Sequence, residues 1–168
     1  DFYRDYLMCD GSYVGKREVY LQFRNKKILT KITLDGLMED LKKYLRFYVL
    51  IHVPEENTHQ DLRNELQRFK ALDFSTSYPL LLYLFNEYEN GRLSINDLIK
   101  SIHALESFHI RRLICGETSR PYSRWFLQAI KRIKDKVKQG FKIIDVLLDF
   151  LNEKGWPDDK QFKNNIVT

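Results

Sequence analysis

Residues 78–116 read YPLLLYLFNEYENGRLSINDLIKSIHALESFHIRRLICG, and this stretch decides the fold class. Its first part is an apolar run from Tyr78 to Phe85, followed by the turn-forming pair Asn90-Gly91. Its second part begins at Ser94, a residue type that caps helix N-termini, and ends at Gly116, a residue type that ends helices. The residues expected on its inner face recur every three or four positions, namely Ile95, Leu98, Ile102, Leu105, His109 and Leu113. The stretch therefore predicts two consecutive helices.

The rest of the chain shows helical spacing too. Further helices are predicted over about 1–8, 19–28, 34–52, 58–72, 122–138 and 141–154, with a last short one after Asp158. Thr33, Thr58 and either Thr76 or Ser77 are the predicted N-caps. The helix after Thr33 is expected to face the core with Leu34, Met38, Leu41, Leu45, Tyr48 and His52. No stretch alternates as a strand would, so we predict an all-α fold, an irregular bundle of about seven helices.

Size and composition agree with a compact helical domain. The chain has 168 residues, of which 43% are hydrophobic and 14% aromatic, enough for a packed core. We predict one helical domain over 1–168, with a subdivision into 1–74 and 75–168 as the alternative. Because the chain begins at Asp1 rather than Met, we expect it to be a fragment of a larger protein.

The cysteines and the longest apolar run bear on localisation. Cys9 and Cys115 match no metal-binding spacing and are expected to be free thiols, which favours a reducing compartment. The run from Tyr78 to Phe85 is far shorter than the roughly 20 residues of a membrane span. We therefore expect a cytoplasmic protein with no membrane partner.

The positive charge is concentrated in one block. Residues 111–142 hold ten Lys and Arg against two acidic residues, whereas the whole chain has a net charge of +5. Such a block can neutralise the phosphates of DNA, although a lysine-rich solvated face and a favourable helix dipole are the simpler explanations. The candidate DNA-contact residues are Arg111, Arg124, Lys131, Lys134 and Lys138.

A second set of residues is predicted to form a polar core. Glu106, His109 and Arg112 lie on or beside the inner face of the helix over 94–115, where a carboxylate needs a partner. A contact between Glu106 and His109, three residues apart, is sterically possible. We expect no catalytic, cofactor-binding or metal-binding residues, and none of the four histidines is expected to bind a metal.

The helix over 94–115 carries Glu106 inside, ends in Arg111-Arg112 and stops at Cys115-Gly116. In these features 78–116 resembles the helical middle region of the GmrSD family, multidomain proteins that include modification-dependent restriction endonucleases. The opening segment, residues 2–7, and the closing segment, residues 155–159 with Phe162, resemble the two ends of that region.

The resemblance implies flanking domains that this chain lacks. In the family a ParB-like nucleotide-hydrolysing domain with an Asp-Gly-Gln-Gln-Arg signature precedes this region, and an HNH-type nuclease domain follows it. Neither Asp10-Gly11 nor Asp35-Gly36 continues as that signature, no HNH motif is present, and residues 117–122 replace the family's Gly-Leu-Asn type segment. The resemblance therefore implies a non-catalytic scaffold or connecting domain of a restriction or phage-defence protein. Its implied partners are the flanking domains of the same polypeptide, and the basic block adds double-stranded DNA.

Two other interpretations stay open. The heavy aromatic content also suits a protein-interaction module that binds a partner helix through aromatic-rich grooves. A stand-alone enzyme would use Glu106 and His109, which would have to meet in an open pocket with perturbed pKa values. No pattern in the sequence indicates the oligomeric state.

Overall fold

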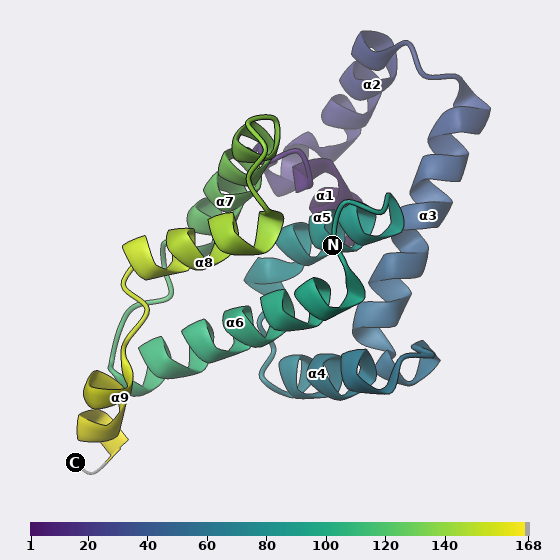
Figure 1. Cartoon of the computed structure of the whole chain (residues 1–168). Helices are drawn as coiled ribbons and strands as arrows, with labels where there is room; N and C mark the ends of the chain where they lie inside the picture. The colour runs from purple at the N-terminus through teal and green to yellow at the C-terminus, as the bar shows by residue number, and fades with distance from the viewer. Residues whose placement is uncertain (167–168) are drawn as a thin grey trace.

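The computed structural model of the chain describes residues 1–166, and the side chains of all of these except 27–30. Within that part the fold is all-α, as predicted, with no strand. Nine α-helices occur there: α1 (Phe2–Met8), α2 (Val19–Thr30), α3 (Leu34–His52), α4 (Gln60–Ala71), α5 (Tyr78–Glu89), α6 (Ile95–Ile114), α7 (Tyr122–Val137), α8 (Ile143–Glu153) and α9 (Asp159–Ile166) (Figure 1). Three short 3-10 helices are η1 (Lys16–Glu18), η2 (Pro54–Glu56) and η3 (Ser75–Ser77).

The described residues form nine α-helices rather than the predicted bundle of about seven, although the predicted helical ranges already include a short helix at each end of the chain. α1 has seven residues and α9 has eight, lengths that are unstable in isolation. Tertiary contacts stabilise them: α1 buries Tyr6 and Leu7 and packs on α5, and α9 packs on the end of α6. Among residues 1–166, no helix combines the length and the apolar character that crossing a bilayer requires.

α5 is the central helix of the molecule. Its apolar residues cover its whole circumference, and Leu80, Leu81, Leu82 and Leu84 are fully buried. α1, α3, α6 and α7 all pack against it, while α4 and α8 cover two other sides of α6 (Figure 1). The single hydrophobic cluster around α5 includes residues from both 1–74 and 75–168.

The predicted N-caps Thr33, Ser94 and Ser77 occupy the N-cap positions of their helices, whereas Thr58 does not. Thr33 accepts a hydrogen bond from the Gly36 amide at 3.0 Å, and Ser94 accepts one from the Asp97 amide at 3.1 Å. α4 is capped by His59 rather than by Thr58. α5 has no side-chain cap, because the Ser77 hydroxyl is turned to a buried partner on α6 instead.

The predicted inner face of α3 is only partly right, since Leu41 and Tyr48 pack against the core but three other predicted residues do not. Leu34, Met38 and Leu45 are 60%, 47% and 47% exposed, whereas Leu37, Phe47 and Ile51 are buried. At 100° per residue, the apolar residues of α3 cover more than half of the helix circumference, so periodicity alone selects no single face. The neighbouring elements cover only part of this apolar surface of α3, and the rest of it is exposed to solvent.

Candidate nucleic-acid interface

Three exposed cations form a row along α7. Arg124 and Lys131 lie on the helix and Lys138 ends it, and consecutive members are seven residues apart. With 3.6 residues per turn and 1.5 Å per residue, they lie within about 40° of one another and about 10.5 Å apart along the axis. Arg120 precedes Arg124 by four residues, in the loop before the helix.

A groove of about 830 Å³ lies beside this row, between α7 and the loop over 10–15. Arg120, Arg124 and Lys131 line it, and the described residues of its wall include no Asp or Glu. Tyr13, which is 66% exposed, forms the opposite wall, and the Arg4 guanidinium lies 5.4 Å from its ring centre. The groove therefore combines positive charge, which the phosphates of DNA can neutralise, with an aromatic face of the kind on which the bases of single strands stack.

Gly11 brings the loop against α7. Its φ of +94° is in the region that favours glycine, and a Cβ there would meet Lys131 Cγ at 2.7 Å and the Leu127 carbonyl oxygen at 3.0 Å. Lys134 holds the same loop, because its Nζ donates a hydrogen bond to the Asp10 carbonyl at 3.1 Å and lies 5.6 Å from the Tyr83 ring centre. Lys134, one of the predicted DNA-contact residues, thus helps to anchor the loop.

Arg111 is also held by contacts within the chain. Its guanidinium donates to the Pro157 carbonyl at 3.0 Å and to Asp159 at 2.6 Å, and it lies 5.1 Å from the Phe162 ring centre. The hydrogen bond and the charge of Arg111 lower the pKa of the Asp159 carboxyl. Arg111 thus fastens α9 to α6, away from the groove on α7.

Arg112 is 5% exposed and joins the ends of two helices. It donates to the carbonyls of Lys154 and Gly155 at 2.8 and 2.9 Å, and to the Tyr122 hydroxyl at 3.2 Å. Its guanidinium also pairs with Glu117 at 3.2 Å. Because these groups satisfy the buried charge, Arg112 connects the end of α6 to the end of α8.

Glu106 is buried, and its partners come from α4 and from its own helix. Arg68 lies 3.5 Å from its carboxylate and also pairs with Glu65, and His103 lies 3.9 Å away. Burial raises the pKa of Glu106, partly offset by Arg68. Glu65, His103 and Glu106 offer ligand atoms within 4.8 Å of one another, so these three residues could hold a metal ion. The HxxE spacing of His103 and Glu106 is visible in the sequence, and the expectation that no histidine binds a metal took no account of it.

His109, the third predicted polar-core residue, is buried beside η3. Its Nε2 and the Ser77 hydroxyl share a hydrogen bond of 2.8 Å, and its ring stacks on Phe74 with the ring centres 4.0 Å apart. Burial lowers the pKa of His109 to about 3, which keeps the imidazole neutral. Glu106 and His109 therefore take different partners, and the contact considered between them is not formed.

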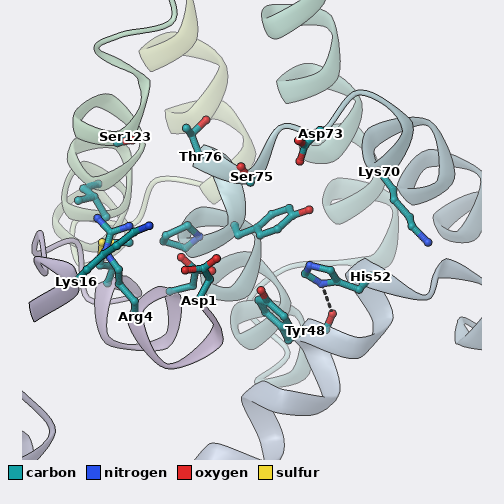
Figure 2. A pocket seen from close by; sticks show the side chains of 15 residues that line it. Asp1, Arg4, Lys16, Tyr48, His52, Lys70, Asp73, Ser75, Thr76 and Ser123 are labelled. Atoms are coloured by element: carbon teal, nitrogen blue, oxygen red, sulfur yellow. Dashed lines mark hydrogen bonds between the residues drawn. The ribbon is translucent and has the colours of Figure 1, made fainter. Parts of the chain in front are cut away.

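A second cavity, of about 640 Å³, adjoins the groove and shares Ser123 and Leu127 with it. Figure 2 shows Arg4 and Lys16 on one side of Asp1, and Tyr48 and His52 on the other. Asp5 and Asp73 also line this cavity, and burial raises the pKa of Asp5 to about 6. Because cations and carboxylates are mixed here, this cavity suits a polyanion less well than the groove does.

The sequence-based prediction named Arg124 and Lys131 but missed Gly11, Tyr13 and Arg120, which also line the groove. Arg120 could have been found, since it lies four residues before Arg124 and so on the same side of the extended helix. Tyr13 and Gly11 have no local signal, because they lie more than a hundred residues from α7 in the chain.

Comparison of the chain with protein-family models, with curated proteins and with solved structures finds no match. The resemblance to the GmrSD helical region therefore stays a prediction that depends on 78–116 and on the two ends of the chain.

Proposed function

We propose that this domain is a non-catalytic helical scaffold that holds double-stranded DNA by its phosphates in the groove between α7 and the loop over 10–15. The observation that carries the proposal is the row of Arg120, Arg124 and Lys131 in a groove whose described wall contains no acidic residue. Lys138 ends the row outside the groove and lies 3.9 Å from Asp135. Cations that have no acidic neighbour inside the groove can be neutralised there by phosphates.

The fold supports a scaffold role. Three buried polar residues of α6 each fasten another element in place: Glu106 meets α4, His109 meets η3, and Arg112 meets the end of α8. Such cross-links suit a domain that keeps other parts of a protein in register. The resemblance of 78–116 supports placing it in a restriction or phage-defence protein, between a nucleotide-hydrolysing domain and a nuclease domain.

Binding to a labelled DNA duplex, measured by fluorescence anisotropy at several salt concentrations, tests the DNA contact. Each neutralised phosphate contributes about −0.9 to the slope of log K against log[salt]. We expect the triple variant Arg124→Gln, Lys131→Gln, Lys138→Gln to bind more weakly and to lose roughly 2.7 from the magnitude of that slope. Lys134 is left unchanged, because it anchors the loop.

The matched control removes the same charge elsewhere. Lys100→Gln, Lys160→Gln, Lys163→Gln changes three exposed lysines on α6 and α9, outside the groove. This control should bind nearly as well as the unmodified protein. Equal weakening by both triple variants would mean that only net charge matters, and unchanged binding by the groove variant would refute the proposal.

A further inference from the structure

The outer face of α3 carries an apolar stripe that nothing in the described chain covers. Leu34, Met38, Leu45 and Val49 are 40–60% exposed. At 100° per residue these four side chains lie within about 60° of one another, along about 22 Å of helix. α3 packs through its other side against α1, α4, α5 and η2, and it forms one edge of the molecule in Figure 1.

The stripe is symmetric about its own midpoint. Leu34 and Val49 are equally far from the point between residues 41 and 42, and so are Met38 and Leu45. If a second α3 lies antiparallel against the first with this midpoint shared, Leu34 faces Val49 of the second copy, and Met38 faces its Leu45. A self-complementary patch of this kind is what a two-fold symmetric contact requires.

The charged residues beside the stripe are ordered in a way that suits an antiparallel pair of α3 helices. Asp35 and Glu39 flank its N-terminal half, and Lys42 and Arg46 flank its C-terminal half. Antiparallel pairing around a two-fold axis places the acidic half of one helix against the basic half of the other. Within one chain Lys42 already pairs with Glu39 at 2.7 Å, and Arg46 pairs with Glu89, but these pairs are exposed and weak.

From this symmetry and charge order we infer that two copies of the chain associate through the outer faces of their α3 helices, antiparallel and around a two-fold axis. One helix pair buries less than the roughly 800 Å² per partner of a standard interface, so the dimer is weak, with a dissociation constant in the micromolar range. This contact is separate from the groove on α7 and does not depend on the proposed DNA binding.

Sedimentation velocity over roughly two decades of concentration around 10 µM tests the dimer. The mass should rise with concentration from 20.2 kDa toward twice that value. Met38→Glu with Leu45→Glu should leave the protein monomeric throughout, because charges would face each other across the axis. These side chains are about half exposed, so circular dichroism and the melting temperature should show an intact fold. The control Leu113→Glu, at another exposed leucine, should dimerise normally.

Charge exchange tests the pairing of acidic with basic halves. The variant Asp35→Lys, Glu39→Lys has an entirely basic flank, and the variant Lys42→Glu, Arg46→Glu has an entirely acidic one. Each alone should remain monomeric, and an equimolar mixture should form a heterodimer. The inference is overturned if the unmodified chain stays monomeric, which would leave the stripe to a different partner. It is also overturned if association survives the Met38→Glu, Leu45→Glu change.

Discussion

At the scale of single residues, the polar side chains of α6 show how this fold provides partners for the charged and hydrogen-bonding groups that it buries. Arg112 donates hydrogen bonds to main-chain carbonyls, Glu106 forms an ion pair with the guanidinium of Arg68, and His109 shares a hydrogen bond with the Ser77 hydroxyl. A buried polar group that loses its partner costs more than an average hydrogen bond contributes, because it can no longer be solvated. Each of these residues therefore specifies which element lies next to α6.

The variant Ser77→Ala tests this role for a single hydrogen bond, the one between Ser77 and His109. The change removes the 2.8 Å hydrogen bond and leaves His109 Nε2 buried without its partner, so the free energy of unfolding should fall by about 1–3 kcal/mol in urea denaturation. Ser101 is the control, because it is equally buried but donates to the Asp97 carbonyl of its own helix. Ser101→Ala should lower the free energy of unfolding clearly less than Ser77→Ala does. Equal losses of unfolding free energy would contradict the special role of the Ser77–His109 bond.

At the scale of elements, the groove depends on how closely a loop approaches a helix. The loop over 10–15 reaches α7 because Gly11 allows both a positive φ and a close contact with the Leu127 carbonyl. α3 shows the opposite case, in which a helix has more apolar surface than its neighbours cover. Secondary structure alone specifies neither outcome.

Gly11→Ala should destabilise the protein more than Gly140→Ala. Both glycines have φ near +90°, so both alanines carry the cost of a left-handed backbone, about 1 kcal/mol. Only at Gly11 does the new Cβ also meet main chain, whereas nothing lies within 4 Å at Gly140. We expect a further loss of about 1–3 kcal/mol for Gly11→Ala, measured by thermal or urea unfolding. Similar losses at both positions would mean that the loop moves away from α7 at little cost.

At the scale of the whole molecule, one hydrophobic cluster around α5 includes residues from both halves of the chain, and His109 lies in its wall against Phe74, Tyr122 and Phe126. Protonation of a group in this position acts on the folding equilibrium of the whole domain. Asp5, a buried residue of α1, has its pKa raised to about 6 by burial and therefore acts in the opposite direction.

Stability should fall as the pH falls below about 6.5, through His109. The folded protein keeps this imidazole neutral down to about pH 3, whereas the unfolded chain binds a proton near 6.5, so acid favours unfolding between these values. Between pH 7 and pH 5 the expected loss from His109 is about 2 kcal/mol, and above about pH 7 it vanishes. Asp5 opposes it between about pH 4 and 6, since its folded form binds a proton more readily than its unfolded form.

His109→Phe separates the two effects. This variant keeps the contribution of Asp5 and removes that of His109, so the difference in unfolding free energy between the unmodified protein and the variant should shrink by about 2 kcal/mol from pH 7 to pH 5. Urea denaturation at several pH values measures it. A difference that is the same at both pH values would show that His109 is not buried as a neutral group.

Much of the helical pattern could be read from the sequence, because its signals are local. The side chains of Thr33 and Ser94 each accept a hydrogen bond from the main-chain amide three residues later. At the start of the helix after Asp158, the side chains of Asp158 and Gln161 each accept a hydrogen bond from the main-chain amide of the other residue. The burial of Glu106, His109 and Arg112 also followed from their place on the inner face of one helix. Capping and periodicity involve residues within one or two turns, so they need no knowledge of the fold.

The sequence by itself determined that this chain forms amphipathic helices and that its excess positive charge lies around α7. Only the tertiary structure decided which cations stay available: Arg111 is paired with Asp159, 48 residues away, and Lys134 with Asp10, 124 residues away, while Arg124 and Lys131 line the groove. Only the tertiary structure, too, left the stripe of α3 uncovered. The physical reason is the same in each case: a partner brought close by folding is not marked by any spacing along the chain.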